Sequence, residues 1–236
     1  MGNELSGGSR VMSFRVILQL IFFILVIPLL PLFITGRWGW WQAWVYAGVN
    51  ILGFVISRAL AARQHPDLLK ERAKFANHQD AASWDKVLAP LVGLGGGLIP
   101  LIAGLDARFG WSPDVPTVWE LVFLVIFLAG YSLGAYALVE NRFFSGMVRI
   151  QEDRGHQVVS DGPYRWMRHP GYAGALLSYL AAPALLDSYW AYVPAGMLAA
   201  LLVVRTRLED ETLSEELDGY DQYTHSVRYR LFPGLW

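Results

Sequence analysis

Uncharged, apolar runs alternate with short polar segments along most of the chain. Four runs are long enough to cross the ~30 Å hydrocarbon layer of a bilayer as helices. They cover residues 16–35, 38–57, 87–105 and 121–139. Two shorter runs, 171–186 and 189–204, each contain a proline and suit two thin spans or a hairpin that reaches only partway. The pattern predicts an all-α integral membrane protein with about six membrane-spanning helices, and five is the alternative.

The first apolar run is predicted to remain in the protein as an anchor helix. It follows Arg10 and Arg15, is longer than the core of a signal peptide, and shows no small-residue cleavage site. Pro28 and Pro31 are expected to kink or end this helix, because proline removes an N–H donor and clashes with the preceding turn.

Basic residues are distributed unevenly between the two sides of the predicted bundle. If the N-terminus is cytoplasmic and six helices alternate, every lysine and arginine except Arg37 and Arg108 falls in a cytoplasmic segment. These residues are Arg10, Arg15, Arg58, Arg63, Lys70, Arg72, Lys74, Lys86, Arg142, Arg149, Arg154, Arg165, Arg168, Arg205, Arg207, Arg228 and Arg230. Cytoplasmic loops of membrane proteins carry such an excess, so the sequence predicts an N-in, C-in topology.

The composition supports this class and excludes several functions. The chain is 54% hydrophobic and 17% charged, and its ten tryptophans suit membrane interfaces. A formal net charge of −1 gives no field that would attract nucleic acid. Without cysteine there is no thiol nucleophile or thiolate metal site, and no histidine pair has metal-ligand spacing. Gly130 and Gly134, like the glycines at 93 and 95–97, favour close helix packing.

We divide the chain at residue 140. Residues 1–140 hold the four longer runs and a mixed apolar and charged loop, 58–86, which suits an interfacial amphipathic helix. Residues 141–236 hold the densest polar stretch beside the membrane and the helical hairpin 171–204.

Two polar clusters in the C-terminal part can carry chemistry. Pro170 disfavours helix at His169 and suits a helix that starts just after it, so His169 is expected at a helix N-terminus, whose positive end favours an anion. A helix continued past Val204 would place Arg205 and Glu209 on one face. Both clusters are cytoplasmic in the predicted topology, so they can meet and enclose a soluble cofactor.

Each of these residues also has an ordinary structural interpretation. Arg205 suits a basic membrane anchor and Glu209 an ion-pair partner. His169 suits a helix cap, and Tyr164 and Tyr172 suit the interfacial aromatic belt. Only the joint arrangement favours a site.

That arrangement closely resembles the isoprenylcysteine carboxyl methyltransferase family, which is akin to the membrane phospholipid methyltransferases. The first motif runs Gly162-Pro163-Tyr164-Arg165-x-x-Arg168-His169-Pro170-x-Tyr172-x-Gly174. The second, about 30 residues later, runs Arg205-x-x-x-Glu209-Asp210-x-x-Leu213. The resemblance covers residues 141–236 in detail and implies a multi-helix membrane enzyme that uses S-adenosylmethionine.

The resemblance also implies roles for individual residues. Arg205 falls where the family binds the substrate carboxylate, and Arg205 and Glu209 are the candidate catalytic residues. The implied cofactor contacts are Gln151, His156, Gln157, Val158, Val159, Tyr164, His169, Pro170, Gly171, Tyr172 and Glu209. The loop before His156 is shorter than in eukaryotic members, which puts Gln151 in question. Asp210 replaces the second of two consecutive glutamates, which leaves its role open.

The predicted reaction is carboxyl O-methylation of a lipophilic acid, such as a prenylated cysteine, by an enzyme whose site faces the cytoplasm among membrane lipids. A carboxylate is already ionised at neutral pH and needs only a cation to hold it, which Arg205 could do bidentately. An amine would need a base, for which His156 and His169 are candidates. The alternatives are N- or S-methylation of a phospholipid amine or small thiol, an NADPH-dependent membrane reductase, and a non-catalytic scaffold or transporter. Membrane sterol reductases also carry Arg-His-Pro followed by a tyrosine. The acceptor and the oligomeric state stay open.

Overall fold

The computed structural model of the chain describes residues 21–73 and 80–236. The predicted N-terminal segment with Arg10 and Arg15, the start of the run 16–35, and Lys74 lie outside the described residues. Within the described ranges every regular element is a helix, as predicted. In chain order these are the π-helix η1 (Phe22–Val26), α2 (Ile27–Thr35), α3 (Trp41–Gln64), α4 (Leu68–Ala73), α5 (Asp85–Gly95), α6 (Leu98–Phe109), α7 (Thr117–Glu140), the 3₁₀ turns η3 (Glu152–Arg154) and η4 (Gly162–Arg165), α8 (Pro170–Leu185), α9 (Tyr192–Glu216) and α10 (Tyr220–Ser226).

Three helical segments among the described residues are long and apolar enough to cross a membrane. They are α3, the stretch Asp85–Phe109 formed by α5 and α6, and α7. The segment Phe22–Thr35 is apolar but shorter. α8 has 16 residues, which at 1.5 Å per residue is about 24 Å and less than a typical hydrocarbon layer. The chain is therefore a helical membrane protein, whereas the predicted six spans stay a prediction.

Several observed helix boundaries differ from the predicted ones. The run 87–105 is divided, because α5 ends at Gly95 and α6 begins at Leu98. The prolines of the first run do not end its helix. Pro28 lies in the first turn of α2, where its missing N–H is not needed, and α2 continues to Thr35. In the loop 58–86 the described residues include the six-residue helix α4, and its position at the membrane interface stays a prediction.

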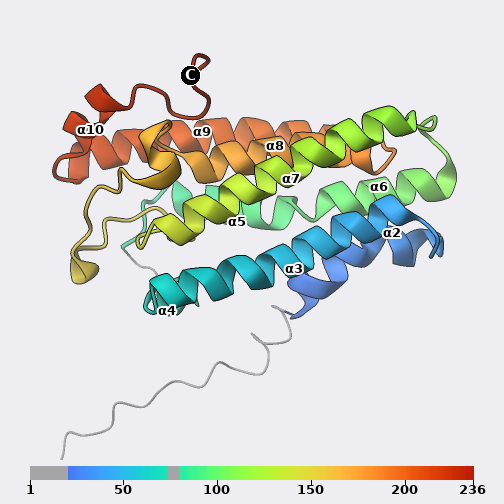
Figure 1. Cartoon of the computed structure of the whole chain (residues 1–236), viewed down its shortest axis with the longest axis horizontal. Coiled ribbons are helices and arrows are strands. Elements are labelled where there is room, and N and C mark those ends of the chain that lie inside the picture. Colours follow the sequence, from blue (N-terminus) through green and yellow to red (C-terminus); the bar gives the residue numbers. More distant parts are fainter. Residues whose placement is uncertain (1–20, 74–79) are drawn as a thin grey trace, which may run out of the picture.

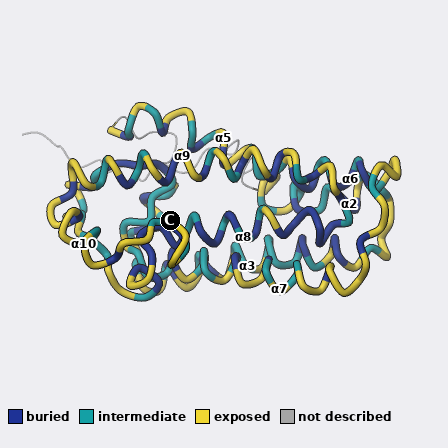
Figure 2. The backbone as a smooth tube through the Cα atoms, turned by 90° about the horizontal axis from the view of Figure 1, so that it is seen from above, coloured by how far each residue is buried: buried dark blue, intermediate teal, exposed yellow. Residues whose placement is uncertain are grey.

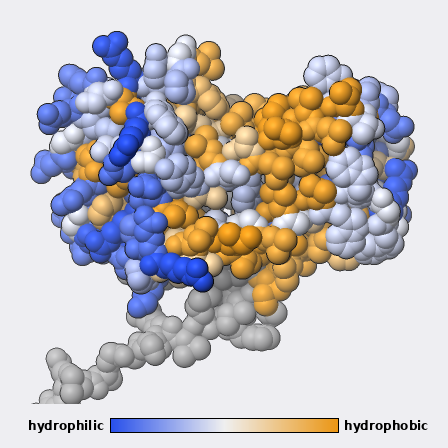
Figure 3. Space-filling model, viewed as in Figure 1, coloured by the Kyte–Doolittle hydropathy of each residue, from blue (hydrophilic) through white to orange (hydrophobic). Residues whose placement is uncertain are grey.

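The polar segments of the chain gather at one end of the bundle. α3 and α7 finish there, α5 and α8 start there, and α9 extends past the apolar core to reach it (Figure 1). We call this end, formed by residues 65–73, 80–85, 141–169 and 205–236, the polar end. Figure 3 shows hydrophilic residues over it and an apolar band beside it. The described basic loops that were predicted to share one side do lie at this end, while its orientation toward the cytoplasm stays a prediction.

α8 lies inside the bundle and packs closely against α7. Figure 2 shows buried and half-buried residues along most of its length. A Cβ atom added at Gly174 would lie 2.5 Å from the carbonyl oxygen of Gly130 and 2.6 Å from the backbone nitrogen of Gly134. The two backbones can approach this closely only because these positions are glycine, as the sequence predicted. The contact fixes the start of α8, which carries the His169 motif, against the end of α7.

Replacing Gly174 with alanine is expected to destabilise the protein by about 1–3 kcal/mol, because the added methyl group would collide with backbone atoms that cannot rotate away. The thermal midpoint of unfolding in detergent measures this effect. Gly196→Ala is the matched control, since a Cβ atom at that position of α9 meets no atom within 4 Å. Equal midpoints for the two variants would contradict the close packing of α7 and α8.

Candidate functional site

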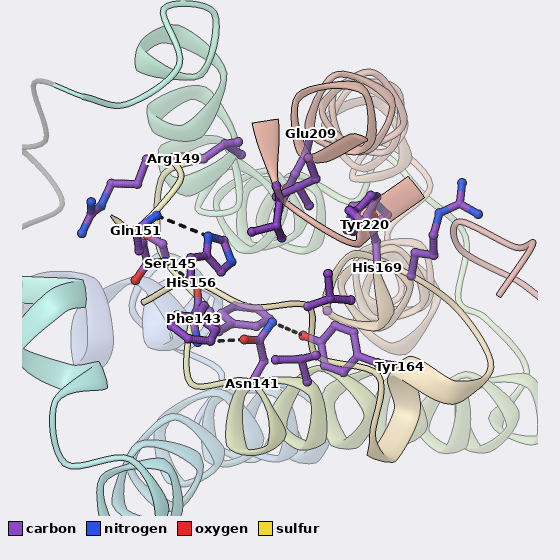
Figure 4. Close-up of a pocket in the computed structure, with 18 of the residues that line it drawn as sticks. Asn141, Phe143, Ser145, Arg149, Gln151, His156, Tyr164, His169, Glu209 and Tyr220 are labelled. Atoms are coloured by element: carbon purple, nitrogen blue, oxygen red, sulfur yellow. Dashed lines mark hydrogen bonds between the residues drawn. The ribbon is translucent and has the colours of Figure 1, made fainter. Parts of the chain in front are cut away.

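A cavity of about 190 Å³ lies in the polar end of the bundle. Its walls come from α4, the loop after α7, the start of α8, the part of α9 in the polar end, and α10 (Figure 4). The lining residues are Arg72, Asn141, Phe143, Phe144, Ser145, Gly146, Met147, Val148, Arg149, Gln151, His156, Gln157, Val158, Val159, Tyr164, Arg168, His169, Gly171, Tyr172, Arg205, Glu209, Leu213, Leu217, Tyr220 and Tyr223. Both sequence motifs therefore border one cavity.

His169 lies directly before α8, as its sequence context predicted. Pro170 occupies the first position of the helix, and the His169 backbone N–H donates to the carbonyl oxygen of Arg230 at 2.9 Å. The side chain is buried, and its Nε2 lies 3.1 Å from Oδ1 of Asp210. The ring stacks on that of Tyr172, with centroids 5.8 Å apart. His169 is thus held from several sides at the cavity wall.

Asp210 is the centre of a buried polar cluster behind His169. Its two carboxylate oxygens accept hydrogen bonds from Nε and Nη2 of Arg168, at 2.7 and 2.8 Å. The Tyr220 hydroxyl donates to Oδ1 at 2.9 Å, and Nε of Arg230 donates to Oδ2 at 2.8 Å. Burial by itself would raise the pKa of Asp210, but the hydrogen bonds from His169 and Arg168 and their charges hold it well below its ordinary value. Asp210 is therefore ionised at neutral pH and joins α8, α9, α10 and the C-terminal segment.

Glu209, the neighbour of Asp210 on α9, has a different environment. The Tyr172 hydroxyl donates a short hydrogen bond to its Oε2. Among the residues that the structure describes, no basic side chain forms an ion pair with Glu209. Its carboxylate lies at the cavity wall (Figure 4) and so contributes a negative charge that forms no ion pair with the basic residues described.

Arg205 lies one helical turn before Glu209, on the face that the i, i+4 spacing predicted. Its Nε and Nη2 donate to Oδ1 and Oδ2 of Asp85, at 2.7 and 2.9 Å, and Nη2 also donates to the Gly146 carbonyl oxygen at 3.0 Å. Asp85 is fully buried and also accepts the backbone N–H of Val148 at 2.6 Å. The Nε–Nη2 edge of Arg205 is therefore occupied by Asp85. This edge is not available for the bidentate hydrogen bonds to a substrate carboxylate that the sequence analysis expected.

The loop between α7 and η4 forms the opposite wall of the cavity. The Gln151 side chain donates to the Phe143 carbonyl oxygen at 2.7 Å and accepts a short hydrogen bond from Arg154. Its backbone N–H donates to Nδ1 of His156 at 3.3 Å. Nδ1 of His156 is therefore an acceptor, which leaves the proton of the neutral ring on Nε2. These bonds fix the course of the loop (Figure 4).

Tyr164 closes the cavity on the side of α7. Its hydroxyl accepts a hydrogen bond from Nδ2 of Asn141 at 3.2 Å and donates to the Ala137 carbonyl oxygen at 3.3 Å. Tyr223 donates to the backbone carbonyl of Tyr164 at 2.6 Å. Burial raises the pKa of the Tyr164 phenol, so it stays neutral.

Comparisons with known proteins match the C-terminal half of the chain. The model of the isoprenylcysteine carboxyl methyltransferase (ICMT) family matches residues 121–215, from α7 to α9. Over these residues the chain is similar to that family. They include His169, Arg205 and Glu209, so the matched segment supplies three of the cavity walls: the loop after α7, the start of α8 and α9.

Curated relatives match over similar lengths. The protein YpbQ of Bacillus subtilis is 37% identical over 109 residues, which cover 44% of this chain and 58% of that protein. A probable protein-S-isoprenylcysteine O-methyltransferase of Oryza sativa subsp. indica is 32% identical over 77 residues, 31% of this chain and 40% of the relative. A protein-S-isoprenylcysteine O-methyltransferase of Schizosaccharomyces pombe is 27% identical over 119 residues, 47% of this chain and 48% of the relative. The chain thus spans about half the length of the curated relatives it matches.

The structure gathers almost all the site residues that the ICMT resemblance indicated. Gln151, His156, Gln157, Val158, Val159, Tyr164, His169, Gly171, Tyr172, Arg205 and Glu209 line the cavity. Pro170 does not line the cavity. It is buried as the first residue of α8 and sets where that helix begins. Both polar atoms of the Gln151 side chain are engaged within the loop, so its contribution to the cavity is mainly the shape of the wall.

Several cavity residues could not be found from the ICMT motifs. Arg72 of α4 precedes the matched segment, as does Asp85 of α5, which does not line the cavity but pairs with Arg205. Tyr220 and Tyr223 follow the matched segment on α10. The sequence marks Asp85 only as an acid before an apolar run, and only the packing of α5 against α9 brings it to Arg205.

His156 is expected to make stability depend on pH. Burial, followed by the positive charges of Arg149 and Arg154, lowers the pKa of His156 to about 4. In the unfolded chain a histidine titrates near 6.5. The unfolded state therefore binds more protons between these values, so stability should fall as the pH falls from about 6.5 toward 4. His156→Asn should lose this part of the decrease, whereas His225→Asn, at an exposed position of α10, should retain it.

Thermal midpoints of the protein and both variants at pH 7 and pH 5 measure this effect. The same decrease in all three proteins would show that His156 is not the group responsible.

Proposed function

We propose that the chain is an S-adenosylmethionine-dependent membrane methyltransferase that esterifies the carboxylate of a lipophilic acid, such as a prenylated cysteine. The observation that carries the proposal is the single cavity in which both halves of the ICMT motif meet, with an unneutralised Glu209 at its wall. The names of the rice and fission-yeast relatives support this substrate class.

The cavity residues fit the chemical character of this cofactor. S-adenosylmethionine carries a sulfonium, an ammonium, a carboxylate and an adenosine. Glu209 offers a negative charge to a cationic part, and the rings of Tyr164 and Tyr172 offer aromatic faces. Met147, Val158 and Leu213 provide apolar wall for a base, beside polar groups of the 141–159 loop. We assign cofactor binding to these residues and to the start of α8.

When bound, the cofactor supplies an electrophilic methyl group whose transfer to a carboxylate oxygen forms a C–O bond, breaks the S–C bond and leaves a neutral thioether. The residues of the chain have three tasks, which are to orient the two reactants, to hold the acceptor carboxylate and to exclude water. No base is required, because the carboxylate is already ionised. Alignment of reactants in this way can lower the barrier by roughly 7–11 kcal/mol.

The proposed topology places the polar end in the cytoplasm, with N-in and C-in ends and about six spans. The clustering of basic residues at the polar end supports it, since cytoplasmic segments carry such an excess. Exposed tryptophans at the opposite end, among them Trp38, Trp44, Trp111 and Trp190, suit the other membrane interface. In this orientation the cofactor enters from the cytosol and the lipophilic acceptor from the bilayer.

Transfer of a labelled methyl group by the purified protein in nanodiscs tests the proposal. The acceptors are an N-acylated S-prenylcysteine and, as a control, its carboxamide, which cannot form an ester. The expected result is label in the lipid extract with the acid only, and its release as methanol by mild base. A base-stable product would favour N- or S-methylation. Tight NADPH binding without transfer would favour a reductase and contradict the proposal.

A further inference from the structure

Three of the four arginines that line the cavity are neutralised by carboxylates of the chain. The pairs are Arg149 with Glu71, Arg168 with Asp210, and Arg205 with Asp85. The fourth is Arg72 of α4, which forms no ion pair with any residue in the ranges 21–73 and 80–236. The cavity wall therefore contains one positive charge that is not neutralised.

Contacts with Phe144 and the ion pair of the neighbouring Glu71 fix the position of Arg72. Nη1 donates to the carbonyl oxygen of Phe144 at 2.9 Å, and the guanidinium lies 5.4 Å from the centre of the Phe144 ring. The neighbouring residue Glu71 is buried and accepts a hydrogen bond of 2.6 Å from Arg149, which ties α4 to the 141–159 loop. Arg72 is thus directed at the cavity with most of its five N–H donors unused.

A cation in this position is poorly stabilised by the protein alone. Burial, followed by repulsion from Arg58 and Arg205, lowers the pKa of Arg72 to about 10, so the side chain is still protonated at neutral pH. Arg72 is partly buried, and a charge that is partly removed from water without a counterion is costly, so an anionic ligand would reduce that cost. A guanidinium also matches the two oxygens of a carboxylate in geometry.

We infer that Arg72 is the cation of this cavity that binds a ligand carboxylate. The inference rests on the proposed function, in which two ligands carry this group: the methyl acceptor and the amino-acid part of the cofactor. Arg205 is less suited, since only its Nη1 has no partner among the described residues. Arg72 and Glu209 then form a pair of opposite, unneutralised charges in one cavity, which suits ligands that together carry both signs.

Arg72→Gln tests the inference, with Arg72→Lys to restore the charge. Arg58→Gln is the matched control, because Arg58 also lacks an ion pair among the described residues but does not line the cavity. The measurements are the KM for the prenylcysteine acceptor and the calorimetric affinities for S-adenosylhomocysteine and methylthioadenosine. Methylthioadenosine lacks the carboxylate and shows whether the adenosine site is intact.

If Arg72 binds the acceptor, Arg72→Gln should raise the acceptor KM at least tenfold and leave both affinities within about twofold. If it binds the cofactor, the affinity for S-adenosylhomocysteine should fall at least tenfold and that for methylthioadenosine should not. Arg72→Lys should recover most of either loss. Three results would overturn the inference. They are an unchanged acceptor KM together with unchanged affinity for S-adenosylhomocysteine, equal losses of affinity for S-adenosylhomocysteine and methylthioadenosine, and the same changes in Arg58→Gln.

The proposed function can fail separately. A protein that binds S-adenosylhomocysteine through Arg72 but transfers no methyl group to the acid would overturn the proposed reaction and leave the role of Arg72 standing. A protein that binds neither nucleoside and transfers no methyl group would overturn both.

Discussion

Replacing Asp210 with alanine is expected to destabilise the protein by about 3–5 kcal/mol, the typical cost of removing one partner of a buried ion pair. The substitution would leave the Arg168 guanidinium buried without its bidentate partner, and Tyr220 and Arg230 would each lose an acceptor. For a chain of this size the change corresponds to roughly 6–20 °C in the thermal midpoint. The unfolding transition in detergent measures it.

Glu211→Ala is the control for Asp210→Ala. Glu211 lies one residue further along α9 and pairs with Arg207 at 2.8 Å, but both side chains are exposed. Because exposed pairs of this kind contribute little, its midpoint should hardly change. Asp210→Asn is a second test, since it keeps the side-chain shape and removes the charge. If Asp210→Ala unfolds at the same temperature as Glu211→Ala, the polar cluster does not join the helices as described.

Replacing Glu209 with glutamine is expected to lower the affinity for the cofactor at least tenfold and methyl transfer by at least as much. Glu209 provides the negative charge of the cavity that no described basic residue neutralises, and a charged hydrogen-bond partner contributes about 1.5–3 kcal/mol. Glutamine keeps the length of the side chain and can still accept from Tyr172. The loss of cofactor affinity therefore measures the contribution of the Glu209 charge and not that of side-chain packing.

Calorimetry with two cofactor analogues determines which part of the cofactor the Glu209 carboxylate faces. S-adenosylhomocysteine has an ammonium but no sulfonium, whereas sinefungin carries a second amine at the place of the methyl group. If Glu209 faces the methyl-donating part, sinefungin should lose more affinity than S-adenosylhomocysteine. Glu211→Gln is the control on the same helix. Wild-type affinity for both analogues in Glu209→Gln would remove Glu209 from the cofactor site.

Local patterns were sufficient for the features that depend on neighbours in the chain. The Arg-His-Pro sequence predicted a helix starting at Pro170, and that start was confirmed because proline favours the first helical position. The i, i+4 spacing put Arg205 and Glu209 on one face of α9, since a helix has 3.6 residues per turn. Gly130 and Gly134 of α7 indicated close helix packing, and the structure shows that the partner is α8 at Gly174.

Helix boundaries were predicted less well, because hydropathy reports lipid exposure and not where a helix stops. α3 and α9 continue past their apolar runs into polar residues, and the added part of α9 carries Arg205 and Glu209 of the cavity. The run 87–105 contains a break between α5 and α6 that leaves no charge or length signal. The sequence left the role of Asp210 open. Four partners, which come from the residues directly before α8, from α10 and from the C-terminal segment, define its place.

The sequence by itself determined that this chain is a helical membrane protein, which end of the bundle carries its polar chemistry, and which family its C-terminal half resembles. Only the tertiary structure decided which charges remain available for ligands. Arg205 finds Asp85 across 120 residues of chain, whereas Arg72 and Glu209 find no ion-pair partner among the described residues. Neutralisation of a charge depends on distances of a few ångströms between separate helices, and no spacing along one chain encodes those distances.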